Sequence, residues 1–230
     1  METVSTIAAF RAALDERRAA GRTVGLVPTM GALHAGHVSL MEASVADRCA
    51  TAATVFVNPL QFAPTEDLSA YPRPFEDDKA KAESAGVDLL FHPSVEEMYP
   101  EPVLTNVHVE RVSARLEGAS RPTHFDGVAT VVNKLFSMAG PCRAYFGEKD
   151  WQQLQVVTRM AHDLSMPVEV VGCPIVRDHD GLALSSRNVY LDAEQREAAP
   201  VIQLALKAGV ASIQAGERST EAVNELMASI

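Results

Sequence analysis

Short apolar runs alternate with longer amphipathic segments through most of this sequence. Residues 23–27 and 50–57, for example, are rich in small and β-branched apolar side chains and stop at or just before a proline. Such runs are typical of strands that are buried on both faces. Parallel strands need helical crossovers, so this alternation predicts an α/β fold: a doubly wound, Rossmann-like parallel sheet with helices on both faces.

The pattern can be followed element by element. We expect helices over residues 5–20, 37–46, 75–85, 126–138 and 150–164, and strands over residues 23–27, 50–57, 87–91, 143–146 and 168–172. Past about residue 176, two helical stretches, 192–215 and 221–230, follow without a strand between them. We therefore expect one domain over residues 1–176 and the beginning of a smaller C-terminal domain over residues 177–230. The helical pattern still runs at Ile230, so we expect that smaller domain to be truncated.

Composition excludes several classes of protein. Thirty acidic residues against twenty basic ones give a net charge of -10, which repels a polyphosphate backbone and argues against a nucleic-acid partner. The three cysteines, Cys49, Cys142 and Cys173, form no Cys-x-x-Cys pair and fit reduced thiols in the cytoplasm. The charged N-terminus and the lack of a long apolar stretch predict neither a signal peptide nor a membrane span.

The loop after the first expected long strand has the composition of a phosphate site. It reads Pro28-Thr29-Met30-Gly31-Ala32-Leu33-His34-Ala35-Gly36-His37. Its glycines allow a close backbone approach, the start of the next helix presents free N–H groups, and imidazoles can donate to phosphate oxygens. The loop is neither a Gly-x-Gly-x-x-Gly motif nor a P-loop, so a different grip on a nucleotide is implied. Zinc held by the two histidines and a purely structural glycine turn are the alternatives.

A second loop, Gly147-Glu148-Lys149-Asp150, also joins an expected strand to a helix. An ammonium group at a helix N-terminus opposes the helix dipole, which is unfavourable for stability and suits a polyphosphate ligand. The alternative is a solvated charge cluster in which Asp150 caps the helix.

Two further segments carry polar side chains near strand ends. Leu184-Ser185-Ser186-Arg187-Asn188 offers hydroxyls and a guanidinium to phosphate oxygens, although such a string is also found in surface loops and helix caps. Asn58-Pro59-Leu60-Gln61-Phe62, together with Gln153, supplies amides that could hold a small polar substrate. Because ligands of parallel sheets lie beyond the carboxyl ends of the strands, we expect these loops to form one site.

Five strings of this sequence, in order, resemble the pantoate:β-alanine ligase family of the nucleotidyltransferases that share a His-x-Gly-His loop. The matching strings are residues 27–37, 57–62, 121–125, 146–153 and 184–188. The resemblance implies a homodimeric enzyme that joins pantoate to β-alanine with ATP and Mg²⁺, through a pantoyl adenylate, and releases AMP and pyrophosphate. It also implies that residues 1–176 bind ATP and pantoate, and that residues 177–230 begin a lid.

The resemblance extends to individual residues. It implies ATP contacts at Met30, Gly31, Ala32, Leu33, His34, Ala35, Gly36, His37, Gly147, Glu148, Lys149, Asp150, Val176, Leu184, Ser185, Ser186 and Arg187. Catalysis would depend on His34, His37, Lys149 and Arg187, which would stabilise charge on the phosphates. The family's proton donor corresponds to His37, which we describe as a hydrogen-bond donor because pyrophosphate leaves readily once its charge is neutralised.

The same resemblance gives candidate contacts for the other ligands. Gln61 and Gln153 would hold pantoate, and Gln61 would also border the β-alanine position. For Mg²⁺ the candidate is Asp77, with Asp78 as the alternative. Second-rank candidates on the matching segments are Asn58, Tyr71, Arg121 and His124.

Two other functions stay open at this stage. A different His-x-Gly-His nucleotidyltransferase would transfer a nucleotidyl group to another small acid or nucleotide. A module that lacks its lid could bind ATP or a metal without catalysis.

Overall fold

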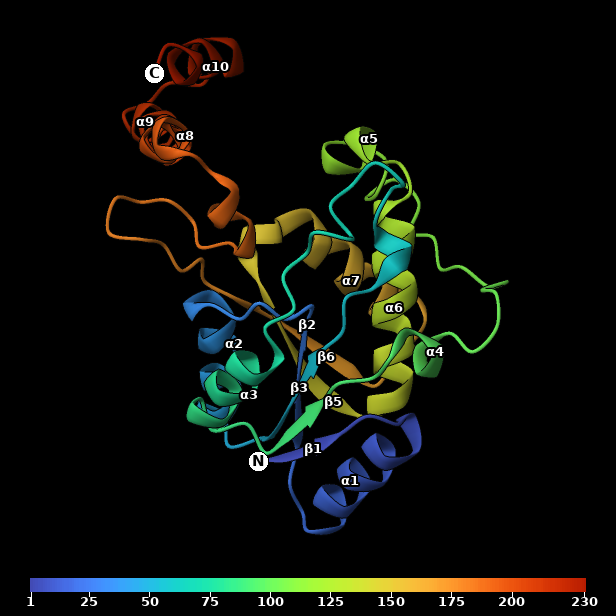
Figure 1. Ribbon diagram of the computed structural model, residues 1–230. Coiled ribbons are helices and arrows are strands. Elements are labelled where there is room, and N and C mark those ends of the chain that lie inside the picture. The colour runs from blue at the N-terminus through green and yellow to red at the C-terminus, as the bar shows by residue number, and fades with distance from the viewer. The chain divides into compact units, whose positions relative to one another are not determined.

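A computed structural model describes residues 1–230, which divide into two compact units, Met1–Pro174 and Ile175–Ile230. The first unit contains a six-stranded sheet in the order β1-β4-β3-β2-β5-β6 (Figure 1), and all its strand pairs are parallel. The strands are β1 (Glu2–Val4), β2 (Val24–Thr29), β3 (Ala50–Val55), β4 (Leu89–Phe91), β5 (Cys142–Gly147) and β6 (Val168–Cys173). The predicted α/β fold with a doubly wound parallel sheet is confirmed.

Helices cover both faces of this sheet. Helices α1, α6 and α7 pack on one face, and α2 and α3 pack on the other (Figure 1). The helices of this unit are α1 (Ile7–Ala19), α2 (Ala35–Ala46), α3 (Phe75–Ser84), α4 (Val95–Met98), α5 (Glu117–Ser120), α6 (His124–Ala139) and α7 (Trp151–Asp163), with 3-10 turns η1 (Pro59–Gln61) and η2 (Glu148–Asp150).

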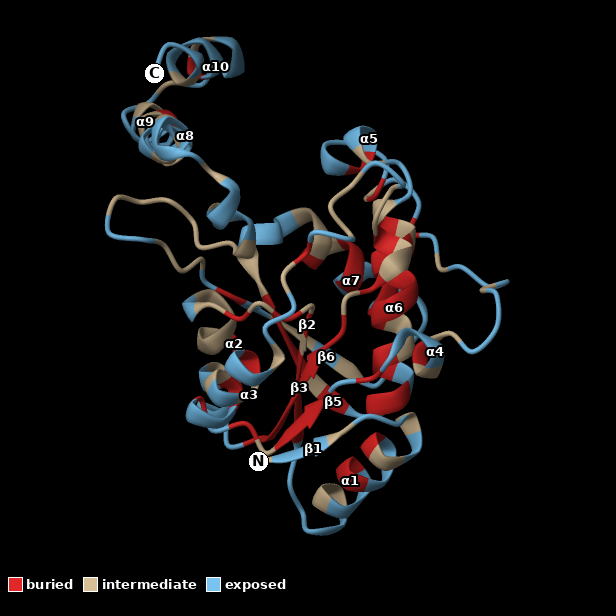
Figure 2. Cartoon of the chain, in the orientation of Figure 1, coloured by how far each residue is buried: buried red, intermediate tan, exposed pale blue.

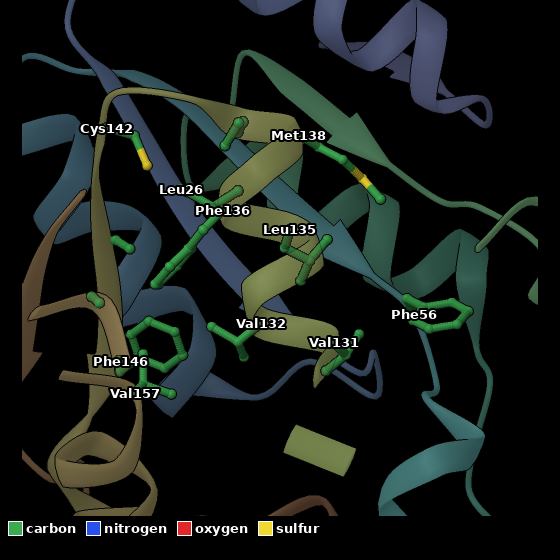
Figure 3. Close-up of a cluster of buried hydrophobic side chains, with 14 of the residues drawn as sticks. Leu26, Phe56, Val131, Val132, Leu135, Phe136, Met138, Cys142, Phe146 and Val157 are labelled. Atoms are coloured by element: carbon green, nitrogen blue, oxygen red, sulfur yellow. The ribbon is translucent and has the colours of Figure 1, made fainter. Parts of the chain in front are cut away.

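The two cores follow from the period of a β-strand, in which successive side chains point to opposite faces. Leu26 and Leu89 belong to the core under α1, α6 and α7, whereas their neighbours Val27 and Leu90 belong to the core under α2 and α3. The four inner strands, β4, β3, β2 and β5, and the inner sides of the helices are accordingly largely buried (Figure 2). Figure 3 shows how α6 side chains such as Phe136 pack over the sheet beside Leu26.

The order of the strands fixes where a ligand can bind. From β2 the chain winds outward to β3 and β4, and it later returns to the other side of β2 to form β5 and β6. The direction of winding reverses between β2 and β5, and in open parallel sheets a crevice forms at such a switch point. The loops that leave the carboxyl ends of β2 and β5 are two of the three segments with expected phosphate contacts.

Two features of the sheet differ from the prediction. The edge strand β1, three residues that pair with β4, is not among the expected strands. The first long strand is expected to end at Val27, whereas β2 continues through Pro28 to Thr29. Beyond Leu26, β2 pairs with β3 alone. A proline lacks the N–H of a ladder residue and is tolerated where the pairing is incomplete.

The second unit is a short hairpin followed by helices. Arg177 and Ala183 form an antiparallel bridge, and a 3-10 turn η3 (Ser186–Tyr190) follows. The helix expected over 192–215 is two helices, α8 (Ala193–Ala198) and α9 (Val201–Gln214), because Pro200 interrupts the backbone hydrogen bonds. Helix α10 (Thr220–Ala228) packs on α9. None of the chain's helices is long and apolar enough to cross a membrane.

Candidate active site

The loop between β2 and α2 is held in place by a buried carboxylate. Asp78, on α3, is fully buried, and its two oxygens accept hydrogen bonds from the backbone N–H groups of Ala32 at 2.8 Å and Leu33 at 2.6 Å. The backbone is left-handed at Gly31 and at Ala32, with φ of 84° and 51°. A Cβ on Gly31 would lie 2.9 Å from an oxygen of Asp78, so glycine is needed there. Asp78 therefore fixes the shape of this loop.

Further bonds reinforce the same loop. The Lys81 ammonium, also on α3, donates to the Leu33 carbonyl at 2.7 Å, and the Thr29 hydroxyl accepts from the Gly31 N–H at 3.2 Å. The backbone N–H groups expected to be free for phosphate are those at the start of α2. The N–H groups of Gly31, Ala32 and Leu33, earlier in the loop, donate to side chains of the protein. The donors that this loop offers a ligand are therefore mainly its imidazoles.

The two histidines form the N-terminal cap of α2. His34 Nδ1 accepts from the Gly36 N–H at 3.1 Å, and His37 Nδ1 accepts from the His34 N–H at 3.4 Å. A ring nitrogen that accepts a backbone N–H carries no proton, so in the neutral ring the proton is on Nε2. The rings lie side by side, with centroids 4.1 Å apart. The cap thus selects a tautomer in which both imidazoles are Nε2–H donors.

The surroundings also keep the two rings uncharged. Burial lowers the pKa of His37 to about 3, and the neighbouring His34, Lys149 and Lys81 act in the same direction. Burial is also the main reason why the pKa of His34 is lowered, followed by the charges of Lys149 and Lys81. At neutral pH both side chains are therefore hydrogen-bond donors without a net charge.

The loop between β5 and α7 supplies the positive charge. Lys149 lies in η2 directly before α7, as expected, and its charge is close enough to lower the pKa of both histidines. Its ammonium contacts Asp150 at 3.3 Å, and both side chains are exposed. Asp150 stands at the N-cap position of α7 but makes no capping hydrogen bond. The alternative in which Asp150 caps this helix is therefore wrong.

A cavity of about 150 Å³ lies beside these loops at the carboxyl ends of the strands. Met30, His37, Asp150 and Gln153 contribute to its wall, which joins the β2 and β5 loops. A third contribution comes from the segment after β3, with Asn58, Gln61 and Tyr71. The opposite wall is apolar and belongs largely to α6, with Val128, Val131, Val132 and Leu135. The cavity thus combines amide and imidazole groups with a branched aliphatic surface.

The backbone of the amide-bearing turn η1 is fixed by two residues that do not line the cavity. The Gln61 carbonyl accepts from His124 Nδ1 at 3.0 Å and from the Arg121 guanidinium at 3.4 Å. Arg121 also donates to the carboxylate of Glu66, and this bond lowers the pKa of that carboxyl. Two of the second-rank candidates, Arg121 and His124, therefore contact the backbone of Gln61. Burial lowers the pKa of His124, which favours the neutral ring that donates through Nδ1.

The remaining predicted contacts belong to the second unit. The Leu184 N–H donates to the Val176 carbonyl at 3.0 Å, so these two expected ATP contacts lie together in the hairpin. The Ser185 hydroxyl accepts from the Arg187 N–H at 3.2 Å and caps η3. In the first unit, Asp77 is exposed and contacts Lys81 at 2.6 Å.

Sequence reasoning missed the role of Asp78, which it considered only as an alternative metal ligand. One signal was available in the sequence: Asp78 stands four residues before the apolar Ala82 on a strongly charged helix, so the two share one face. The structure shows that both are fully buried. An acidic residue on the apolar face of a helix requires hydrogen-bond donors from another segment. The sequence does not indicate which segment supplies them.

The fold and the site define an α/β enzyme with its cleft at the switch point of a parallel sheet and an imidazole-rich loop beside a lysine. Comparison with known proteins gives the family. The family model of pantoate-beta-alanine ligase matches residues 2–230. The chain belongs to this family of ligases, which form a carbon–nitrogen bond.

Individual relatives agree with this assignment. The chain is 55% identical to the pantothenate synthetase of Sinorhizobium medicae over 90% of its own length and 71% of the relative's. It is 52% identical to that of Desulfitobacterium hafniense, over 95% and 78%. The crystal structure of pantothenate synthetase from Thermus thermophilus superimposes with a TM-score of 0.93 at 54% identity, covering 100% of this chain and 83% of that one.

A more distant structure carries ligands. The pantoate-beta-alanine ligase of Francisella tularensis, complexed with beta-gamma ATP and β-alanine, has a TM-score of 0.85 and 32% identity, covering 100% of this chain and 85% of its own.

Proposed function

We propose that this chain condenses (R)-pantoate with β-alanine at the cavity in the first unit, using ATP and forming a pantoyl adenylate. The observation that carries the proposal is the composition of that cavity. Its amides, Asn58, Gln61 and Gln153, face an aliphatic wall of α6, and the imidazole of His37 stands at the same cavity. A branched hydroxy acid needs such a wall for its hydrocarbon and such amides for its oxygens. ATP and β-alanine are the ligands of the Francisella tularensis relative.

The first half-reaction would activate the acid. A pantoate carboxylate oxygen attacks the α-phosphorus of ATP, and the bond from that phosphorus to the bridging oxygen of pyrophosphate breaks. Negative charge increases on the leaving pyrophosphate, so catalysis depends on donors fixed in advance. His34 and His37 would donate from Nε2, since their Nδ1 atoms accept backbone protons. Lys149 would add the positive charge that the neutral rings lack.

The second half-reaction would form the amide. The neutral amine of β-alanine attacks the acyl carbon of the adenylate, AMP leaves with the electron pair of the carbon–oxygen bond, and the amine gives its extra proton to water. We propose that Gln61 borders the amine's position and that Gln61 and Gln153 hold the pantoyl group. In the second unit, Val176 and Leu184–Arg187 are the proposed further contacts of ATP.

Mg²⁺ is a second proposed component. The chain gathers no cluster of three or more histidine, cysteine, aspartate or glutamate side chains as a metal site. Mg²⁺ is commonly held by substrate phosphates and one or two carboxylates. Asp77 is exposed on α3 and is the proposed protein contact. Asp78 fits poorly, because both of its oxygens already accept backbone N–H groups. A bound Mg²⁺ would neutralise phosphate charge.

The assembly and the compartment are also proposals. Leu104 and Leu116, both strongly exposed, stand between α4 and α6 and would be covered in a homodimer. Light scattering at several protein concentrations measures the mass directly. The three cysteines are buried and unpaired, which fits the reducing conditions of the cytoplasm.

Product analysis tests the proposed reaction. Purified protein with ATP, Mg²⁺, pantoate and β-alanine should release AMP and pyrophosphate and form pantothenate, and AMP release should require both substrates. Exchange of labelled pyrophosphate into ATP should require pantoate alone. AMP release that does not depend on pantoate, or adenylation of another acid in its place, would contradict the proposal.

A further inference from the structure

Tyr99 stands outside the cavity, yet its hydroxyl reaches the amides that line it. The residue ends α4 and is partly buried between the ring of Phe56, at 6.0 Å, and the ammonium of Lys134, at 5.7 Å. Its hydroxyl donates to Asn58 Oδ1 at 2.8 Å. Burial raises the pKa of Tyr99, so the hydroxyl keeps its proton throughout the neutral range. This tyrosine is not among the residues that the family resemblance implies.

The Tyr99 hydroxyl, together with the Gly127 carbonyl and the Leu60 N–H, holds the orientation of the first amide. Asn58 is almost completely buried, and its Oδ1 accepts from Tyr99 and, more weakly, from the Leu60 N–H at 3.4 Å. Its Nδ2 must then donate, and it does so to the Gly127 carbonyl at 3.1 Å and to Gln61 Oε1 at 3.2 Å. The opposite orientation would place the Asn58 oxygen against two acceptors, the Gly127 carbonyl and Gln61 Oε1. It would also place the Asn58 NH₂ group against the Leu60 N–H, and the Tyr99 hydroxyl would have to accept instead of donate.

The orientation of the Gln61 amide follows from that of Asn58. Because Gln61 Oε1 accepts a hydrogen bond from Asn58 Nδ2, the Nε2 group is available to a ligand in the cavity. One of its protons points to the Met30 sulfur at 3.2 Å, which is a weak acceptor. The other proton has no partner in the protein and can serve a ligand oxygen. A glutamine turned the other way would instead present a carbonyl, which repels a carboxylate.

We propose that Tyr99 is a positioning residue whose hydroxyl, through Asn58, orients the Gln61 amide so that the cavity presents an N–H donor to the oxygens of the acid substrate. The inference rests on the proposed function, because it concerns how the same cavity recognises a hydroxy acid. It adds that the preference for an oxygen acceptor depends on a residue outside the cavity, two hydrogen bonds away from the Gln61 amide.

The change Tyr99→Phe removes the hydroxyl and keeps the ring between Phe56 and Lys134. We expect the KM for pantoate to rise about 5- to 10-fold, the equivalent of one hydrogen bond. The kcat and the KM for ATP should stay within about 2-fold of the unmodified enzyme, because neither the phosphate loops nor the reacting atoms are touched. An unchanged KM for pantoate, or an equal change in the KM for ATP, would overturn the proposal.

Tyr145 provides a matched control. Its hydroxyl is also buried and also bonded to a side chain, Asp47 at 2.8 Å, but Asp47 lies at the C-terminus of α2, at the opposite end of the strands from the cavity. Tyr145→Phe should lower the stability by an amount similar to Tyr99→Phe and leave the KM for pantoate unchanged. If both variants raise that KM equally, the effect is a general loss of stability, and the proposed positioning of Gln61 by Tyr99 is wrong.

A double-mutant cycle isolates the route through Gln61. Gln61→Ala removes the oriented amide, and Tyr99→Phe added to it should raise the KM for pantoate by no more than about 2-fold further. If the two changes multiply, so that the full 5- to 10-fold factor persists without Gln61, Tyr99 does not act through that residue.

The orientation can also be measured when the enzyme does not turn over. In the ¹⁵N-labelled protein without ligands, Tyr99→Phe should shift the side-chain amide signals of Asn58 and Gln61, whereas Tyr145→Phe should leave them in place. Failure of the proposed reaction would appear as no pantothenate from the unmodified chain with these NMR shifts intact. Failure of the proposed positioning by Tyr99 would appear as normal turnover by the unmodified chain with no shift of the Asn58 and Gln61 amide signals in Tyr99→Phe.

Discussion

The two loops at the switch point of the sheet are built in opposite ways. The β2–α2 loop is held by a buried carboxylate of α3, and its two imidazoles cap the N-terminus of the following helix. The β5–α7 loop carries an exposed lysine that pairs with the adjacent aspartate, and its helix has no side-chain cap. The first loop offers neutral donors in fixed positions, whereas the second offers a positive charge on an exposed side chain. A site for a charged substrate needs both, since fixed donors give geometry and an exposed charge gives attraction.

The largest effect should come from removing the exposed charge of Lys149. Lys149→Ala should lower the rate of pantoate-dependent pyrophosphate exchange by about 10²- to 10³-fold, as the loss of one electrostatic donor does in other enzymes. The free energy of unfolding in urea should change by less than about 0.5 kcal/mol, because the lysine is exposed and its pairing with Asp150 is screened. Lys207→Ala, on the exposed side of α9, is the control for the loss of a lysine. An undiminished exchange rate in Lys149→Ala would remove this lysine from the mechanism.

The next effect concerns the anchor of the first loop. Asp78→Asn replaces one accepting oxygen by an NH₂ group that faces a backbone N–H of Ala32 or Leu33. The free energy of unfolding should therefore fall by about 2–3 kcal/mol. Pyrophosphate exchange should fall with it, because the histidines lose their support. Glu76→Gln, on the exposed first turn of the same helix, should change stability by less than about 0.5 kcal/mol. Equal stability of the two variants in a urea titration would show that the loop does not need its anchor.

The neutral histidine of the first loop predicts a pH dependence of stability. His37 has a folded-state pKa of about 3 against 6.5 in the unfolded chain, so between these values the unfolded state binds more protons and stability falls as the pH is lowered. At pH 5 this loss amounts to about 2 kcal/mol, and well above pH 6.5 it is absent.

The difference between the unmodified protein and His37→Asn isolates this contribution. Urea titrations at pH 7 and pH 5 should show that the variant loses about 2 kcal/mol less over this interval, whereas exposed His162→Asn should behave like the unmodified protein. The same pH dependence in all three proteins would mean that His37 titrates normally.

The smallest effect belongs to the second loop. Asp150→Ala should change the free energy of unfolding by less than about 0.5 kcal/mol, because its carboxylate caps no backbone N–H of α7. Thr6→Ala is the matched comparison: the Thr6 hydroxyl accepts from the Ala9 N–H at 3.2 Å and caps α1, so its loss should cost about 1 kcal/mol. A larger loss of stability in Asp150→Ala than in Thr6→Ala, by thermal or urea unfolding, would show that Asp150 stabilises the β5–α7 loop.

The elements that sequence predicts best are those with a clear local pattern. Helix α6 was predicted because its apolar side chains repeat at helical spacing, and strands such as β3 because they are short, continuous apolar runs. The effects of Pro28 and Pro200 were both predicted wrongly. Pro28 was expected to end its strand and does not, whereas Pro200 divides a helix that was expected to be continuous. A proline's effect depends on whether its missing N–H is needed, which is decided by neighbouring strands rather than by local sequence.

The site shows the same limit. Local motifs were enough to predict that His37, Gln61, Asp150 and Gln153 contribute to one cavity, because each follows a strand end. The positions of Asp78 and Tyr99 could not be predicted, since their partners lie 46 and 41 residues away in the sequence. Both act by fixing other residues, and such support depends on contacts between distant segments, which a single sequence does not display.

The short edge strand β1 has a consequence for handling this protein. Glu2–Val4 pair with Leu89–Phe91, the fully buried residues of β4. Deleting the first four residues would leave the backbone of an apolar strand open along its length, ready to pair with the same strand of another molecule. Shortening the chain at this end should therefore favour aggregation even though no residue of the cleft is altered.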